Sequence, residues 1–304
     1  MLRYLTVILV NYLLWLSIEH ACGEYFDSNT ICDCNCDVQV DVVRTFHQEL
    51  QTMRKREDDI LREISLVQTK LQSVDKHNGG GKPKPSSCVE AAAGSFKSGI
   101  YNIKLDKFSA TPFDVFCNEE TDYGGWLVIQ RRVSDSVGFY RGWQDYKKGF
   151  GELAGNYWIG LEKLHALTSS CQQELYIELQ KLNGDSYHAR YTEFLIGSES
   201  EGYPLKVLGN YTGTAGDSMI FHVGMKFTTR DSDNDNAPQG NCAIDYKGAW
   251  WFDRCFTSHL NGKRIQNMTW NTLGNMEALK SALMMIRPTD KCLRRLSLKK
   301  DLYQ

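Results

Sequence analysis

The sequence predicts a secreted α+β protein in which an N-terminal export signal and a coiled-coil helix precede one large globular domain. Three observations predict this organisation. The chain of 304 residues starts with a mostly apolar run, continues with a heptad repeat, and carries ten cysteines. An apolar fraction of 42% allows a sizeable core, and this length allows one or two domains.

Residues 1–23 have the features of an export signal. A positive Arg3 precedes a mostly apolar run over residues 5–18, which several polar residues interrupt. This run is shorter than the ~20 apolar residues that a membrane-spanning helix needs. The small residues Ala21 and Gly23 suit cleavage after Gly23. The alternative is an uncleaved signal anchor, and no later segment is apolar enough to span a membrane.

Residues 24–37 are predicted to bond one chain to another. Cys32, Cys34 and Cys36 alternate within this segment. A metal site normally uses wider cysteine spacing and further ligands, and alternate cysteines are poorly placed to bond with each other. If Cys22 leaves with the signal, nine cysteines remain, and an odd number in a secreted chain indicates intermolecular pairing or a free thiol.

Residues 38–76 carry a heptad seam and are predicted to form an oligomerising coiled coil. The seam positions are separated by three and four residues in turn, and nine of the ten are apolar. The ten positions are Val43, Phe46, Leu50, Met53, Glu57, Ile60, Ile64, Val67, Leu71 and Val74. Parallel dimers prefer Leu at the d position, which here holds Ile60, Val67 and Val74, so we expect a trimer or a higher oligomer. The alternative is a single amphipathic helix that lies on the globular domain.

The globular domain is predicted to span residues 88–288, after a Gly- and Pro-rich linker over residues 77–87. Apolar runs typical of strands and one helical pattern follow each other without regular alternation, which indicates an α+β fold. The strand-like runs are 113–117, 126–132, 175–179 and 283–286, and the helical pattern covers 161–167. A basic tail is predicted over residues 289–304, with contact to acidic glycans or simple solvation as the two alternatives.

Charge and motifs exclude two classes of function. The chain has 35 Lys and Arg against 37 Asp and Glu, a formal net charge of −2. Nucleic-acid binders normally show a basic surplus, so no nucleic-acid partner is expected. The sequence also lacks a G-x-S-x-G elbow, an H-E-x-x-H motif and a P-loop, and its seven histidines are scattered. We therefore expect a protein that is not an enzyme.

The acidic segment from Asp231 to Cys242 is a candidate calcium loop. Alternating acids converge oxygen atoms on a hard cation, and calcium accepts six to eight oxygen ligands, including backbone carbonyls. The segment begins like an EF-hand loop, but Asn236 occupies the usual glycine position and Cys242 the usual glutamate position. The alternative is a solvated acidic turn.

The motifs of the globular domain identify its family by resemblance. They cover almost all of residues 88–288, in family order, and resemble the fibrinogen C-terminal domain of ficolins, tachylectins, tenascins and angiopoietins. The domain is most similar to the ficolin-like members and the fibrinogen-related lectins of invertebrates. The matching motifs are SGIYNI, PFDVFCNEETDYGGWLVIQRR, FYRGWQDYKKGFG, YWIGLEKLHALT, YTGTAGDSM, KFTTRDSDND, NCAIDYKGAWWFDRC, LNG and MMIRP.

This resemblance implies a mainly antiparallel sheet, two disulfides and a calcium site. The implied bridges are Cys88–Cys117 and Cys242–Cys255. The implied calcium ligands are the carboxylates of Asp233 and Asp235, with backbone carbonyls among Ala237, Pro238 and Gly240. The resemblance also implies a cis peptide bond between Arg254 and Cys255. Cys171 and Cys292 are not in the shared pattern: they form a third bridge if the strands at 175–179 and 283–286 are neighbours, and otherwise Cys292 is free to bond another chain.

The resemblance further implies a ligand pocket formed by Tyr246, Arg254, Cys255 and Phe256. In lectin-like relatives this pocket takes acetyl groups, with an aromatic wall for the methyl group. This chain departs from the pattern at two places. Phe256 stands where relatives commonly have His, and the loop over residues 263–267 is short. The alternative for Tyr246 and Phe256 is ordinary packing beside the disulfide.

Two sequons, at Asn210 and Asn267, fit N-glycosylation. A glycan on Asn267 would lie near the pocket and could obstruct it.

Two functions are implied for the chain. The first is a calcium-dependent, homo-oligomeric lectin of innate defence that binds acetylated or related glycans on cell or microbial surfaces. The second is a protein ligand for a receptor, or a matrix-adhesion factor, as in angiopoietin-like and tenascin-like relatives.

Overall fold

The structure, a computed structural model, describes residues 48, 51–52, 55–56, 59, 84–105, 108–109, 111–274 and 277–294. The chain divides into two units, Met1–Gly81 and Lys82–Gln304. The export signal, the three N-terminal cysteines and the heptad seam lie outside the described residues. Six residues of the predicted coiled coil are described, and all six are helical and exposed. They are Gln48, Gln51, Thr52, Lys55, Arg56 and Asp59.

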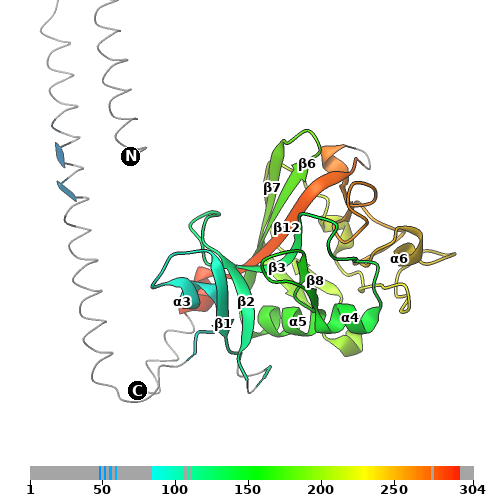
Figure 1. Cartoon of the computed structure of the whole chain (residues 1–304), viewed down its shortest axis with the longest axis horizontal. Helices are drawn as coiled ribbons and strands as arrows, with labels where there is room; N and C mark the ends of the chain where they lie inside the picture. The colour runs from blue at the N-terminus through cyan, green and yellow to red at the C-terminus, as the bar shows by residue number, and fades with distance from the viewer. Residues whose placement is uncertain are drawn as a thin grey trace, which may run out of the picture. The chain divides into compact units, whose positions relative to one another are not determined.

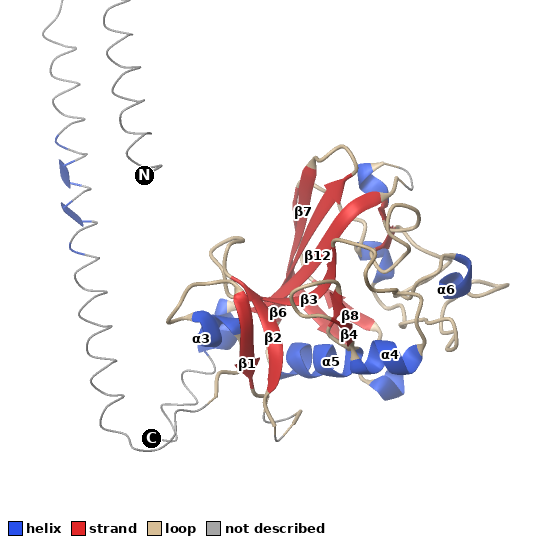
Figure 2. Cartoon of the chain, in the orientation of Figure 1, coloured by secondary structure: helices blue, strands red, loops and turns tan. Residues whose placement is uncertain are grey.

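An antiparallel sheet organises residues 84–294, here called the head (Figures 1 and 2). The order of its main strands is β1-β2-β3-β12-β6-β7-β8, and every pairing within it is antiparallel. These strands are β1 (Gly99–Ile103), β2 (Phe113–Asn118), β3 (Trp126–Arg132), β6 (Gln173–Lys181), β7 (Ser186–Ile196), β8 (Leu205–Leu208) and β12 (Leu279–Pro288). Three short strands pair with this sheet: β5 (Tyr157–Trp158) pairs with β3 and with β4 (Phe150–Gly151), and β9 (Tyr211–Gly213) pairs with β7. A separate two-stranded sheet consists of β10 (Ser258–His259) and β11 (Thr269–Trp270). The sheet confirms the mainly antiparallel α+β domain predicted from the sequence.

The C-terminal strand β12 lies in the middle of the sheet, between β3 and β6. Its burial agrees with this position, because Ala282, Met284, Met285 and Ile286 are buried, whereas Leu283 is half-buried. In β6, Leu175, Ile177 and Leu179 are buried, whereas the residues between them are half-buried. This two-residue period directs one face of the sheet into the core and leaves the other face accessible.

The helices of the head are short. In α5 (Leu161–Ser170), the side chains of Leu161, Leu164 and Leu167 are buried, at the spacing of one helical face. The other elements are α3 (Cys88–Ala92), α4 (Trp143–Lys148), α6 (Cys242–Asp245), η1 (Glu199–Glu201), η2 (Ile220–His222) and η3 (Asn271–Leu273). Among the helices of the described residues, none has the length and apolar character needed to cross a bilayer.

Residues just outside the predicted 88–288 also make hydrogen bonds with the head at both ends. The backbone N–H of Lys104 donates to the carbonyl oxygen of Pro85 at 2.8 Å, and Ser87 is the N-cap of α3. Residues 84–87 therefore pack on the domain and do not act as linker. At the other end, Thr289 donates to the Gln172 carbonyl at 3.0 Å, and residues 290–294 are helical. The solvated tail can begin only after this helical turn.

Three disulfides brace the head. Cys88–Cys117 joins the start of α3 to β2, and Cys242–Cys255 joins α6 to the following loop. Cys171–Cys292 links the end of α5 to the C-terminal turn, because β6 and β12 are neighbours. The Cα–Cα distances are 5.4, 5.7 and 5.7 Å, within the usual range for disulfides.

Tyr123 is held in left-handed backbone between β2 and β3. Asp122, Tyr123, Gly124 and Gly125 all have positive φ, with 66° at Tyr123. Arg287 holds this turn through hydrogen bonds to the carbonyl oxygens of Asp122 at 2.7 Å and Gly124 at 2.8 Å. The side chain of Tyr123 is 100% exposed, so its ring offsets none of the backbone strain by packing.

Replacing Tyr123 with glycine should therefore stabilise the head by about 1 kcal/mol, because glycine adopts positive φ without steric cost. Thermal unfolding should show a melting temperature about 2–4 °C higher for a domain of this size. Tyr123→Ala is the matched control: it removes the ring, keeps the Cβ and should leave the melting temperature unchanged. A glycine variant less stable than the wild type would contradict this assignment of strain.

Candidate functional site

The acidic loop forms a closed turn before α6. Asp235 holds it together, because its carboxylate accepts backbone N–H groups from Ala237 at 3.0 Å and Cys242 at 2.9 Å. The Asp233 carboxylate accepts the backbone N–H of Asp235 at 3.3 Å. Asn234 anchors the loop to the core through the Phe227 carbonyl at 2.9 Å. The two predicted carboxylate ligands therefore lie on one ordered turn.

The donor atoms of this turn fit a hard cation. Burial, together with the neighbouring carboxylate of Asp233, raises the pKa of Asp235 despite its two backbone N–H donors. A bound cation would oppose this shift, because it stabilises the charged form. Within the described residues, the carbonyl oxygens of Ala237, Pro238 and Gly240 accept no backbone hydrogen bond, which leaves them available as ligands. The part of the chain that the structure describes contains no cluster of three or more His, Cys, Asp or Glu side chains for a metal, so a calcium ion here would need backbone carbonyls and water in addition to the carboxylates of Asp233 and Asp235.

The acidic loop is coupled to the Cys255 turn by hydrogen bonds and by the disulfide. Asn236 donates to Asp253 twice, from its backbone at 3.0 Å and from its side chain at 2.8 Å. Cys242, whose N–H binds the Asp235 carboxylate, is bonded to Cys255. The peptide bond Arg254–Cys255 is cis. These contacts connect the backbone of the acidic loop directly to the turn that carries Phe256.

The predicted pocket residues gather on one side of this disulfide. Tyr246 caps the C-terminus of α6, and its ring contacts Phe256 edge to face, with centroids 4.7 Å apart. Both rings are half-buried, Cys255 is half-buried, and Arg254 is exposed. The structure thus brings Tyr246 and Phe256 together as a small aromatic wall, with Arg254 beside it on the same turn.

A buried histidine supports this wall, and its role was not apparent from the sequence. The ring centroid of His259 lies 5.1 Å from Phe256 and 5.0 Å from Phe252. His259 is fully buried, and neither ring nitrogen has a hydrogen-bond partner. Burial, with smaller contributions from Arg132 and His222, lowers the pKa of His259 well below its usual value.

His222 is a second buried histidine next to this cluster. Its Nδ1 lies 2.7 Å from the carbonyl oxygen of Trp251, and its Nε2 accepts the backbone N–H of Ser258 at 3.1 Å. These partners require a neutral ring with the proton on Nδ1. Burial lowers the pKa of His222 to about 4. In the sequence both histidines are isolated, and no local pattern signals their burial.

The short loop over residues 263–267 lies against the aromatic wall. The side-chain amide of Asn267 donates to the carbonyl oxygen of Tyr246 at 3.1 Å. A glycan on Asn267 would have to leave from this same half-buried nitrogen. Ile265 on this loop and Ile244 on α6 are exposed. The other sequon residue, Asn210, is exposed in the turn between β8 and β9.

Four hollows in the surface of the head are lined by described residues, and none of these four includes Tyr246 or Phe256. Tyr246 and Phe256 are half-buried, so part of each ring stays accessible beside the loop.

The chain is similar to known proteins in sequence. Residues 84–289 match the family described as "Fibrinogen beta and gamma chains, C-terminal globular domain". The chain is 34% identical over 277 residues to Fibrinogen C domain-containing protein 1 of Mus musculus, covering 79% of this chain and 60% of that protein. It is 41% identical over 219 residues to Fibroleukin of Homo sapiens, covering 65% of this chain and 49% of that protein.

A solved structure is similar as well. The fibrinogen-like globe domain of human ANGPTL2 matches with a TM-score of 0.63 and 40% sequence identity, over 67% of this chain and 99% of that domain. The chain spans no more than 60% of the length of the mouse and human curated relatives named above. The shared part with each of the three proteins therefore centres on the head.

Proposed function

The chain belongs to the fibrinogen C-terminal globular domain family, a family of non-enzymatic binding domains, and from this membership we propose that it is a secreted, calcium-dependent lectin. The head would bind acetylated or related glycans on cell or microbial surfaces. A coiled coil over residues 38–76 would join three or more chains, with Cys32, Cys34 and Cys36 bonding between them. Its disulfide-bonded head suits an oxidising, extracellular compartment.

One observation carries this proposal: the acidic loop and the aromatic wall are parts of one connected unit. Asp235 binds the N–H of Cys242, Asn236 binds Asp253, and the disulfide continues to Cys255. Calcium held by Asp233, Asp235 and backbone carbonyls would order the turn that presents Tyr246 and Phe256. Calcium supplies charge neutralisation and fixed geometry at the loop, while the aromatic rings supply the contact with an acetyl methyl group.

Oligomerisation would compensate for weak binding by each head. The wall presents only part of two rings to a glycan, so one head should bind weakly. Linking several heads raises the effective concentration of the second and third, and avidity can exceed the single-site affinity by about 10²–10⁴. The head and the predicted coiled coil therefore support the same function.

Calcium removal should abolish retention of the oligomeric protein on an acetylated resin, and free acetylated sugar should elute it in calcium. Asp233→Ala should reduce retention at physiological calcium by at least about tenfold, because the loop loses one charged ligand. Asp114→Ala, an exposed aspartate on β2, is the matched control and should behave as wild type. Thermal unfolding checks that each variant is folded. Retention that persists unchanged in a chelator would refute the calcium-dependent lectin.

A protein ligand is the second candidate, and the exposed side chains of Ile265 and Ile244 near the wall favour it. Exposed aliphatic groups beside a pocket suit a protein surface better than a sugar. The same preparation distinguishes the two functions. Protein that fails on the acetylated resin but binds cells whose glycans have been removed would support the second candidate.

A further inference from the structure

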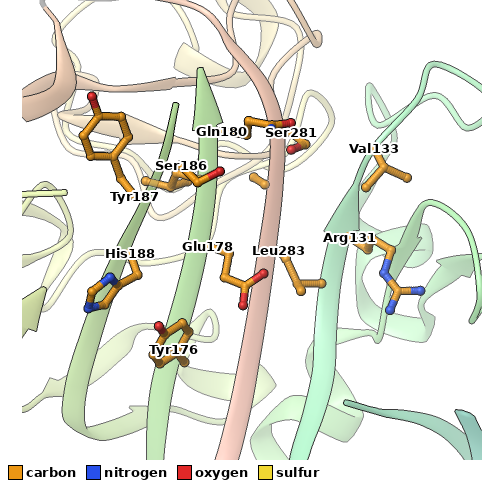
Figure 3. A pocket seen from close by; sticks show the side chains of 12 residues that line it. Arg131, Val133, Tyr176, Glu178, Gln180, Ser186, Tyr187, His188, Ser281 and Leu283 are labelled. Carbon is orange, nitrogen blue, oxygen red and sulfur yellow. The ribbon is translucent and has the colours of Figure 1, made fainter. Parts of the chain in front are cut away.

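We propose that the accessible face of the central sheet is a second binding site, separate from the calcium loop, for a neutral oligosaccharide. Strands β3, β12, β6 and β7 form a hollow of about 410 Å³ on this face. Figure 3 shows the residues that line it, with Glu178 and Leu283 between His188 on one side and Arg131 on the other. This volume lies in the usual range for ligand sites.

Strand register places four side chains in one row across the sheet. Arg131 is opposite Leu283, Leu283 is opposite Glu178, and Glu178 is opposite His188. A second row contains Ser281, Gln180 and Ser186. Directly opposite side chains in a sheet lie within about 5.5 Å of each other, so both rows form continuous surfaces.

The hollow combines an apolar floor with a polar rim. Leu283 is the aliphatic centre, and the rings of Tyr176 and His188 stack beside it, 5.5 Å apart and 3° from parallel. One carboxylate oxygen of Glu178 accepts the Thr121 hydroxyl at 2.7 Å, which leaves the other oxygen to accept from a ligand. The second row adds two hydroxyls and an amide. A sugar ring has matching chemistry, with apolar C–H faces and hydroxyl groups around its edge.

Other ligand classes fit this face less well. Extended peptides bind sheets by pairing with an exposed edge strand. Both β6 and β12 are interior strands with neighbours on each side, so they offer side chains and no edge. An anionic ligand would need a free cation, but the Arg131 guanidinium donates to the Leu153 carbonyl at 3.0 Å and lies 4.2 Å from the centroid of Phe116. Glu178 would repel an anion further.

The proposed site does not depend on calcium. No residue of the acidic loop or of the aromatic wall lines the hollow. Binding at the sheet face should therefore persist in a chelator, which removes the contribution of the calcium loop. This difference makes the sheet site testable whether or not the proposed lectin function of the loop is correct.

The test uses the full-length oligomeric protein in a chelator, on an array of neutral linear oligosaccharides of four to six hexose units, with acidic glycans printed beside them. Wild type should bind neutral oligosaccharides. Glu178→Ala and Ser186→Arg should each weaken binding by at least about tenfold, the first by removing an acceptor and the second by filling the hollow. Ser186 is exposed, so its replacement should not disturb folding.

Matched controls separate the site from general effects on the head. Glu162→Ala on α5 removes an exposed glutamate outside the hollow, and Ser200→Arg adds the same cation in η1. Both should bind as wild type does. The proposal is overturned if wild type binds no neutral oligosaccharide in the chelator, if it binds acidic glycans alone, or if the two hollow variants bind within twofold of the controls. If the wild type binds the array in a chelator but is not retained on the acetylated resin in calcium, the lectin function of the loop is refuted and the sheet site is not.

Discussion

Lowering the pH from 7 to 4 should destabilise the head by about 3 kcal/mol through His222 alone, with a further loss through His259. The pKa of His222 falls from 6.5 to about 4 in the folded head because the ring is buried, although Asp253 partly opposes the shift. A difference of about two and a half pKa units corresponds to roughly 3 kcal/mol. The pKa of His259 is lowered in the same direction by burial, Arg132 and His222.

The sign follows from proton binding in the two states. Between pH 6.5 and about 4, an unfolded chain takes up a proton at His222, whereas the folded head keeps this ring neutral. The stabilising contribution is therefore complete above pH 6.5, falls as the pH drops through this window, and is exhausted below about pH 4. Acid pulls the equilibrium toward the unfolded state.

Urea unfolding at pH 7, 5.5 and 4, followed by tryptophan fluorescence, measures this effect. Of the seven tryptophans only Trp15 lies outside the head, so the signal reports on the head. His259→Leu removes two unpaired ring nitrogens and one titrating group, so it should reduce the pH dependence of stability to the part that His222 contributes. A midpoint that stays constant from pH 7 to 4 in the wild type would show that the buried histidines do not control acid stability.

Removal of the Cys171–Cys292 disulfide should cost about 4–5 kcal/mol of stability, more than removal of either of the other two. This bridge closes a sequence separation of 121 residues, against 29 for Cys88–Cys117 and 13 for Cys242–Cys255. In the chain-entropy account, a disulfide that closes a long loop restricts the unfolded chain most. The resulting stabilisation of the folded state is about 4.7 kcal/mol for a loop of 100 residues and about 3 kcal/mol for a loop of 15.

Denaturant unfolding of the double variant Cys171→Ala/Cys292→Ala tests this ordering. The double variant Cys242→Ala/Cys255→Ala is the matched control and should lose less stability. It should nevertheless lose calcium-dependent retention on the resin, because this bridge connects the acidic loop to Phe256. Equal denaturation midpoints for wild type and Cys171→Ala/Cys292→Ala would contradict the stabilising role of the long bridge.

The structure shows what the two departures from the family pocket, Phe256 and the short 263–267 loop, contact. Phe256 contributes to the aromatic wall, packs on buried His259 and contacts Tyr246. The short 263–267 loop is bound to the Tyr246 carbonyl through Asn267. Both rings stay partly accessible, and we expect this wall to contact either an acetyl group or the surface of a protein. This is why the resin and the glycan-stripped cells are the decisive pair of measurements.

Much of the head could be predicted because its signals are local in the chain. The predicted strand at 126–132 coincides with β3, and the helical pattern at 161–167 lies within α5. The runs at 175–179 and 283–286 fall within β6 and β12, although each strand is longer. Their ends could not be predicted, since polar residues such as Glu174 and Arg287 extend the strands through an ion pair, 2.7 Å long, that joins β6 to β12.

The candidate site was predicted in part for the same reason. Asp233, Asp235 and Cys242 lie within ten residues, so their spacing alone indicated an oxygen-rich turn. The supporting histidines were missed, because His259 approaches Phe252, Phe256 and His222 only after folding. Burial is a property of three-dimensional neighbours, and an isolated histidine carries no mark of it in the sequence.

By itself the sequence determined the family of the chain and the absence of enzymatic motifs, because motifs and residue spacing are read along the chain. Tertiary structure alone decided that Cys171 reaches Cys292 and that Arg131, Leu283, Glu178 and His188 form one row. Each of these results depends on β12 lying between β3 and β6. That strand comes more than 90 residues after β6 in the chain, and no local pattern specifies which strands it will join.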